Sequence, residues 1–140
     1  MASVSEPNAI LKVVLIEDSR ELLALLTEML NEIPTVKVVA SAATEQDALE
    51  VFKTTSADLA IIDLELQSGT GLNLLKNCCQ PQALDHALHF LVFSNYANRV
   101  IQHRCMELGA KAFFDKSFQL EELLDFVQSR ALQKRVGYST

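Results

Sequence analysis

Short apolar runs alternate with longer segments of helical periodicity along this chain. The short runs predict strands at residues 12–16, 36–42, 59–62, 89–93 and 112–114. The longer segments carry an apolar residue every three or four positions and predict helices over 22–33, 45–52, 72–79, 99–108 and from 119 onward. Punctuating residues support these bounds: Pro34 and Pro81 close two helices, Thr44 is a typical N-cap, and Gly109 follows the fourth helix.

Five strand–helix alternations predict an open α/β sandwich. Parallel strands need crossover connections, which the intervening helices supply. The strands are almost wholly apolar, as expected when helices cover both faces of a sheet. A chain of 140 residues fits one domain, which we expect to span 11–132, with a flexible segment at 1–10 and a tail at 133–140.

Composition excludes several functional classes. Apolar residues make up 49% of the chain, which is typical of a globular protein. The 12 basic and 18 acidic residues give a net charge of -6, and no segment forms a basic stripe, so nucleic acid is not an expected partner. No run approaches the roughly eighteen apolar residues of a membrane span, and no export signal begins the chain. Three cysteines form no disulfide framework, which favours a cytoplasmic location.

Ionisable and polar residues stand just beyond four of the predicted strands. They are Glu17, Asp18, Asp63, Ser94 and Lys116. Ligands of open α/β sheets bind beyond the carboxyl ends of the strands, so these side chains are expected to converge. Crowded carboxylates call for a cation, and Mg²⁺ binds through carboxylates, waters and phosphate oxygens. With a lysine and a hydroxyl alongside, the set indicates phosphoryl transfer to an aspartate nucleophile.

The order and spacing of these residues resemble the receiver domain of two-component response regulators. The resemblance runs from about Leu11 to Leu132 and includes the acidic pair, the third-strand aspartate with the run 69–75, and the run 109–118 around the lysine. It implies a flavodoxin-like, doubly wound sheet of five parallel strands in the order 2-1-3-4-5, as in chemotaxis receivers. It also implies a phospho-accepting signalling domain rather than an enzyme.

The resemblance further implies the metal site and the partners. Asp63 would accept a phosphoryl group from a histidine of a sensor kinase or a histidine phosphotransfer protein. Asp18 would ligate Mg²⁺ directly and Glu17 through water, while Asp63 and the backbone carbonyl of Glu65 would complete the site. Because one helix uses most of the 24 residues after Lys116, we expect a stand-alone receiver that binds an unknown downstream protein, with homodimerisation left open.

A conformational switch is the last implication of the resemblance. Lys116 and Ser94 would bind the phosphoryl oxygens. Movement of Ser94 toward the new group would leave space into which Phe113 turns. The surface formed by the fourth helix, fifth strand and fifth helix would then change shape, which is a population shift driven by charge-assisted contacts.

Two loop positions depart from the family pattern. Ser117 stands where the lysine is usually followed by a cis proline. Because a non-prolyl cis bond costs about 2.5–4 kcal/mol, we predict a trans Lys116–Ser117 bond, with Ser117 capping the last helix. Gln67 stands where proline is common, which predicts a less rigid loop after Asp63.

Other departures flank the predicted phosphorylation site. Asn95 replaces a small residue next to Ser94 and is expected to narrow access to the phosphoryl group. The bulk of Glu65 and Tyr96 predicts slow hydrolysis of an acyl phosphate.

Alternative functions remain at this point. Haloacid-dehalogenase-like phosphatases use similar residues, but their nucleophile precedes the acidic pair, and Glu65 stands where they have a second aspartate. The same residue opposes a Toprim-like nuclease. A phosphorylation-independent pseudo-receiver is kept open by Asn95 and Ser117. A zinc site at Cys78, Cys79, His86 and His89 is disfavoured because the spacing fits no standard finger.

Overall fold

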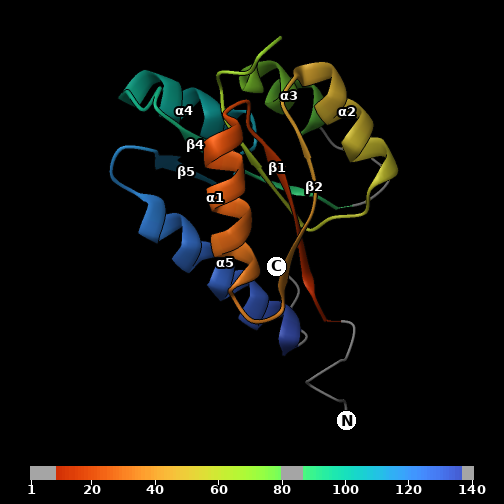
Figure 1. The fold of residues 1–140 in the computed structure, drawn as a ribbon. Helices are drawn as coiled ribbons and strands as arrows, with labels where there is room; N and C mark the ends of the chain where they lie inside the picture. Colours follow the sequence, from red (N-terminus) through yellow and green to blue (C-terminus); the bar gives the residue numbers. More distant parts are fainter. Residues whose placement is uncertain (1–8, 80–86, 137–140) are drawn as a thin grey trace.

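Strands and helices alternate strictly along the chain in the computed structural model, which describes residues 9–79 and 87–136 (Figure 1). The elements are β1 (Leu11–Ile16), α1 (Arg20–Asn31), β2 (Val36–Ala42), α2 (Glu45–Thr54), β3 (Leu59–Ile62), α3 (Gly71–Cys78), β4 (His89–Ser94), α4 (Arg99–Glu107), β5 (Ala112–Asp115) and α5 (Leu120–Arg135). All ten predicted elements are therefore present. Helix α5 continues to Arg135, and Pro81, the expected end of the third helix, lies outside the described residues.

The five strands form one parallel sheet in the order β2-β1-β3-β4-β5. This confirms the doubly wound, flavodoxin-like fold. The strand order reverses between β1 and β3, which pair from Val13↔Leu59 to Ile16↔Ile62. That reversal creates a crevice beyond the ends of β1 and β3, where ligands of such sheets bind.

Two hydrophobic clusters cover the two faces of the sheet. Val13 and Leu15 of β1 join the cluster under α1 and α5, whereas Val14 and Ile16 join the cluster under α2, α3 and α4. Successive strand residues point to opposite faces, so a fully apolar strand serves both clusters. Figure 1 shows α1 and α5 together on one side and α2 beside α3 on the other. The loops at the carboxyl ends of the strands are thereby held on a rigid base.

Polar side chains fix where most of the helices begin. The Thr44 hydroxyl accepts a hydrogen bond from the Asp47 N–H at 3.0 Å, which confirms it as the N-cap of α2. Ser19, Thr70 and Asn98 cap α1, α3 and α4 in the same way. No described helix is both long enough and apolar enough to cross a membrane.

The start of α5 differs from expectation. The Lys116–Ser117 bond is trans as predicted, but Ser117 does not cap the helix. Its N–H donates to the Asp115 carboxylate at 2.8 Å, and the Gln119 N–H donates to the Asp115 carbonyl at 2.8 Å. This turn delays the helix, so that Gln119 occupies the N-cap position, without a side-chain cap bond.

Candidate functional site

Three of the predicted site residues are held by the sheet itself, although they lie at or just beyond the strand ends. The N–H of Glu17 donates to a β2 carbonyl at 2.9 Å, that of Asp63 to a β1 carbonyl at 3.0 Å, and that of Lys116 to the Ser94 carbonyl of β4 at 3.1 Å. These bonds continue the parallel ladder by one step. The three side chains therefore start from backbone positions with little freedom.

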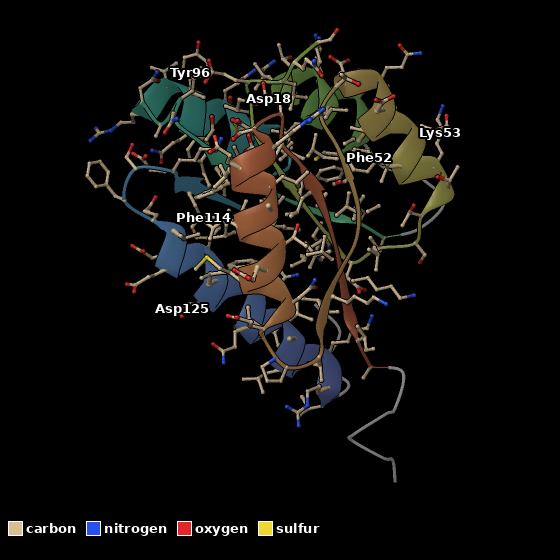
Figure 2. The ribbon with its side chains drawn as sticks, viewed as in Figure 1. Asp18, Phe52, Lys53, Tyr96, Phe114 and Asp125 are labelled. Atoms are coloured by element: carbon tan, nitrogen blue, oxygen red, sulfur yellow. The ribbon has the colours of Figure 1, made fainter. Side chains whose placement is uncertain are left out.

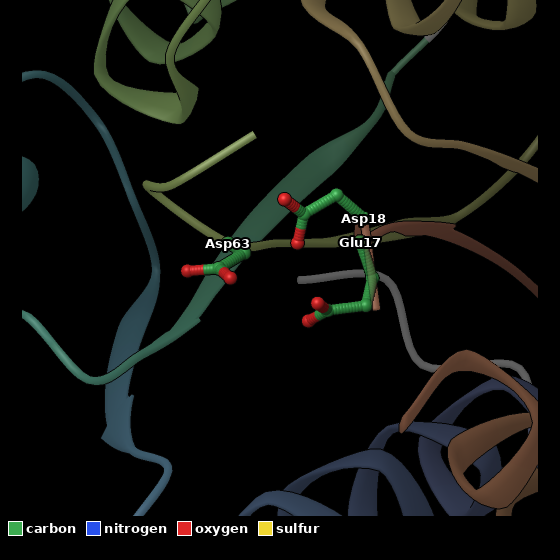
Figure 3. Close-up of side chains that lie close together, drawn as sticks. All are labelled: Glu17, Asp18 and Asp63. Carbon is green, nitrogen blue, oxygen red and sulfur yellow. The ribbon is translucent and has the colours of Figure 1, made fainter. Parts of the chain in front are cut away.

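Glu17, Asp18 and Asp63 bring three carboxylates together at the crevice. Their nearest oxygens all lie within 4.8 Å of one another, and Figure 3 shows Glu17 and Asp18 approaching from one strand end and Asp63 from the other. Glu17 and Asp63 are each only 4% exposed, whereas Asp18 is exposed. Oxygen ligands at this separation suit a hard divalent cation such as Mg²⁺.

Lys116 joins two of these carboxylates. Its Nζ lies 2.7 Å from Asp63 Oδ2 and 2.9 Å from Glu17 Oε1, and its side chain is only 13% exposed. Three carboxylates and one ammonium leave two negative charges uncompensated. One divalent cation would balance them, so the donor set fits Mg²⁺ in charge as well as in ligand type.

Burial and ion pairing act in opposite directions on this cluster. Burial raises the pKa of Glu17 above its usual 4.5, although hydrogen bonds from Lys116 and Ser19 oppose the rise. Burial alone would lower the pKa of Lys116, but its hydrogen bonds to Asp63 and Glu17 outweigh burial and raise that pKa above 10.5. Lys116 is therefore a permanent cation in the site.

Backbone amides hold the remaining carboxylate oxygens. The Ser19 N–H donates to Glu17 Oε2 at 3.0 Å, and the Glu65 N–H donates to Asp63 Oδ1 at 3.2 Å. Helix α3 begins against Asp63, because Gly71 lies so close that a Cβ there would collide with the Asp63 carbonyl. Both buried carboxylates are thus oriented from two sides, by an amide and by the lysine.

The residues expected around the phosphoryl position lie on the neighbouring loops. Ser94 is fully buried, and its hydroxyl accepts a hydrogen bond from the Tyr96 N–H at 3.1 Å. Tyr96 itself is exposed, at the same end of the molecule as Asp18 (Figure 2). The Ser117 hydroxyl lies 3.5 Å from Asn95 Oδ1, so these two unusual residues contact each other across the loops. The expected effects of Glu65, Asn95 and Tyr96 on the reaction stay predictions.

The expected switch aromatic faces the helix layer of α2, α3 and α4. Phe113 is half-buried against that cluster, whereas Phe114 is buried in the opposite cluster. Of the two adjacent aromatics, Phe113 is therefore the one that faces the helix layer containing α4. Its rotation stays a prediction.

A hollow of about 560 Å³ opens beside the acidic pair. It is lined by Glu17, Asp18, Arg20, Leu23, Ser41, Ala42, Ala43 and Gln67. Sequence analysis did not single out Arg20 or Ser41, because their approach to the acidic pair depends on how α1 and β2 pack. The hollow gives the carboxylates an open side through which a ligand can reach them.

No zinc cluster forms among the described residues. Within residues 9–79 and 87–136, Glu17, Asp18 and Asp63 are the one group of three or more potential ligand side chains that meets. Cys78, Cys79 and His89 form no such group, and His86 lies outside the described residues. Cys78 is buried, and burial raises its thiol pKa, which disfavours the thiolate that zinc requires.

Comparison with known proteins decides the family. The family model of the response regulator receiver domain matches residues 13–128. The chain belongs to this family. Receiver domains are the phospho-accepting signalling domains of two-component systems, so the predicted family and its signalling role are confirmed.

Curated relatives match this chain over only part of their own length. The chain is 28% identical over 134 residues to a protein-glutamate methylesterase/protein-glutamine glutaminase of Clostridium acetobutylicum, covering 92% of this chain and 37% of the relative. It is 28% identical over 120 residues to the transcriptional regulatory protein DesR of Bacillus subtilis, covering 86% of this chain and 58% of DesR. The chain thus spans less than two thirds of both relatives.

Solved receiver domains have the same fold. A two-component response regulator of the LuxR family from Aurantimonas sp. SI85-9A1 aligns with a TM-score of 0.77 at 22% identity, covering 87% of this chain and 85% of that one. The non-phosphorylated HemR receiver domain of Leptospira biflexa aligns with a TM-score of 0.72 at 30% identity, covering 87% and 94%.

Proposed function

We propose that this receiver domain accepts a phosphoryl group on Asp63 from a phosphohistidine of a sensor kinase or a histidine phosphotransfer protein, in a reaction that depends on Mg²⁺. The observation that carries the proposal is the contact of the Asp63 carboxylate with Lys116 at 2.7 Å inside a cluster of three carboxylates. A lone buried ion pair would need no further acids. The excess negative charge is what a metal-assisted phosphoryl acceptor requires.

Each residue of the cluster has a separate task in this reaction. Asp18 and Asp63 would ligate Mg²⁺ directly together with the Glu65 carbonyl, and Glu17 through a water molecule. When bound, Mg²⁺ supplies positive charge to the phosphoryl oxygens. An Asp63 oxygen forms a bond to phosphorus while the phosphorus–nitrogen bond of the donor histidine breaks, and the electron pair of that bond returns to the imidazole. Lys116 shifts its ammonium from the carboxylates toward a phosphoryl oxygen.

Signal output follows from the new charge on Asp63. The Ser94 hydroxyl, which accepts from the Tyr96 N–H, would turn to donate to a phosphoryl oxygen. Phe113 packs beneath α4 and would rotate into the space that Ser94 vacates. The surface of α4, β5 and α5 then presents a different shape to a downstream protein.

Incubation with Mg²⁺ and acetyl phosphate, followed by intact-mass spectrometry, tests the proposal. Wild type is expected to gain one phosphate, and Asp63→Asn to gain none. Asp58→Asn is the matched control, because Asp58 also pairs with a lysine, Lys134, but lies outside the site. Chelation of Mg²⁺ is expected to remove the gain.

Three other outcomes would contradict the proposal. Continuous release of phosphate without a phosphorylated protein would favour a hydrolase of the haloacid-dehalogenase type. An unmodified wild type would favour a phosphorylation-independent binding module. Modification that persists in Asp63→Asn would assign the acceptor to another residue.

A further inference from the structure

The loop that follows Asp63 is fastened to the start of α2. The Gln67 N–H donates to the Ala43 carbonyl at 3.0 Å, and the Glu45 N–H donates to the Ser68 carbonyl at 2.9 Å. Thr44 and Ser68 form an isolated parallel bridge between these bonds. The loop therefore has a short sheet-like pairing with the segment that precedes α2.

A side chain adds a third bond to this pairing. The Thr70 N–H donates to Glu45 Oε1 at 3.0 Å, which ties the end of the loop to the first residue of α2. Glu45 also packs over Gly69, whose φ is 79°, and a Cβ at Gly69 would collide with the Glu45 side chain. Both the backbone conformation and the close approach favour glycine at this position. The Glu45 carboxylate thus fits directly against the loop.

The hydrogen bond that the Gln67 N–H donates requires a residue other than proline at position 67. The family pattern that the sequence resembles has proline at this position, and proline stiffens a loop through its fixed φ but has no N–H to donate. In this chain the Gln67 N–H pairs with the Ala43 carbonyl. Without proline the loop after Asp63 was expected to be less rigid. The hydrogen bond of the Gln67 N–H, which proline could not make, opposes that effect.

This fastened loop also contacts the proposed phosphoryl acceptor. The Glu65 N–H donates to Asp63 Oδ1, and the loop closes on itself through the Gly71 N–H, which donates to the Leu64 carbonyl at 3.0 Å. Glu65 and Thr70 face each other in an antiparallel bridge. A bond at Thr70 therefore restrains the peptide of Glu65 across the loop.

We propose that Glu45 and the Gln67 N–H are positioning groups, which hold the loop so that the Glu65 peptide and the Asp63 carboxylate are preorganised for Mg²⁺ and for phosphorylation. The inference rests on the proposed function. In this proposal Glu45 has the role of a hydrogen-bond acceptor for the Thr70 N–H rather than that of a charge. An amide oxygen at the same position can accept that bond, which separates the two roles experimentally.

Four variants of the full chain test this inference. Glu45→Ala removes the acceptor, Glu45→Gln keeps it, and Gln67→Pro removes the backbone donor. Glu50→Ala is the matched control, because it removes a carboxylate from an exposed position on the same helix. Two properties are measured: Mg²⁺ affinity by calorimetric titration, and amide hydrogen exchange of Glu65, Gln67 and Thr70 in the absence of Mg²⁺.

Glu45→Ala and Gln67→Pro are expected to weaken Mg²⁺ binding about fivefold, the equivalent of one ordinary hydrogen bond. Exchange at Glu65 and Thr70 is expected to quicken by a similar factor in both. Glu45→Gln and Glu50→Ala are expected to match wild type. Rescue by glutamine is a result that a charge effect would not produce.

The results separate this inference from the proposed function. If wild type takes no phosphate while Glu45→Ala still weakens Mg²⁺ binding, the proposed function fails and the positioning role stands. If wild type is phosphorylated and Glu45→Ala binds Mg²⁺ normally, the positioning role is overturned, even if exchange is faster. A Glu45→Gln variant as weak as Glu45→Ala would overturn the hydrogen-bond account.

Discussion

Two lysine–aspartate pairs stand at opposite edges of the same sheet. At the carboxyl edge, Lys116 Nζ lies 2.7 Å from Asp63, with side chains 13% and 4% exposed. At the amino edge, Lys134 Nζ lies 2.8 Å from Asp58, with side chains 35% and 32% exposed. The two ion pairs have nearly the same length and differ in burial and in their neighbours.

The neighbours of the two pairs indicate different roles. Both oxygens of Asp58 contact Lys134, and one of them also accepts the Lys12 N–H at 2.8 Å, so the charge of Asp58 is matched one to one. This pair fastens α5 to the start of β3. At the carboxyl edge a single lysine serves Asp63 and Glu17, with Asp18 close by. A balanced, half-exposed pair is typical of a structural contact, whereas a buried excess of carboxylates is typical of a metal-dependent site.

Replacing each lysine by methionine is expected to separate the two edges most clearly. Lys116→Met leaves two buried carboxylates without their cation, and breaking a buried pair costs about 3–5 kcal/mol. Lys134→Met is expected to cost less than about 1 kcal/mol, because exposed pairs contribute little. Urea unfolding without divalent cations measures both free energies. Equal losses in the two variants would contradict the distinction between the edges.

Mg²⁺ is expected to stabilise the protein through one edge only. A ligand that binds the folded state at 100 times its Kd adds about 2.7 kcal/mol to the free energy of unfolding. Wild type and Asp58→Asn are expected to show this gain, and Asp18→Asn to lose most of it. Urea unfolding over a series of Mg²⁺ concentrations measures the gain. If Asp58→Asn instead lost the Mg²⁺-dependent gain in unfolding free energy, the metal would bind at the amino edge and the prediction would be contradicted.

Sequence patterns predicted the fold well because both faces of the sheet are buried. Fully apolar strands separated by periodic helices leave few other architectures. The strand order came from the family resemblance, since pairing between β1 and β3 depends on contacts far apart in the chain. The meeting of Glu17, Asp18 and Asp63 followed from strand-end positions alone. Parallel strands bring their carboxyl ends to one edge whatever their loops do.

Contacts between loops were beyond the sequence patterns. The strand-end positions predicted that Lys116 and Glu17 converge but not that they pair, and the bond of Glu45 to Thr70 depends on how α2 packs against the loop after Asp63. Gly69 was a signal for the contact of Glu45 with the loop, because an isolated glycine in a loop is typical of a positive φ or of a close approach by another group. The expected cap by Ser117 was wrong because the turn at Asp115 delays the start of α5, so that Gln119 occupies the N-cap position.

Lowering the pH is expected to change the free energy of unfolding in opposite directions at the two edges. These changes are the smallest of the three that we predict. At the amino edge, Arg130 Nη1 lies 2.8 Å from His89 Nδ1, and burial together with Arg130 and Lys111 lowers the His89 pKa below 6.5. The unfolded chain then binds a proton first, so stability falls as the pH falls from 6.5 through the folded-state pKa. At the carboxyl edge, burial raises the pKa of Glu17 above 4.5. The folded state binds that proton first, so stability rises as the pH falls through the folded-state pKa toward 4.5.

Single substitutions separate these opposing contributions. His89→Gln is expected to reduce the loss of unfolding free energy between pH 7 and 4.5, and Glu17→Gln is expected to increase that loss. Each change is at most about 1 kcal/mol after solvent screening. Urea unfolding between pH 4.5 and 7 without Mg²⁺ gives the slopes. Slopes that change in the same direction in both variants would contradict the assignment. Such a result would mean that burial does not shift the pKa of at least one of these two groups in the direction assigned to it.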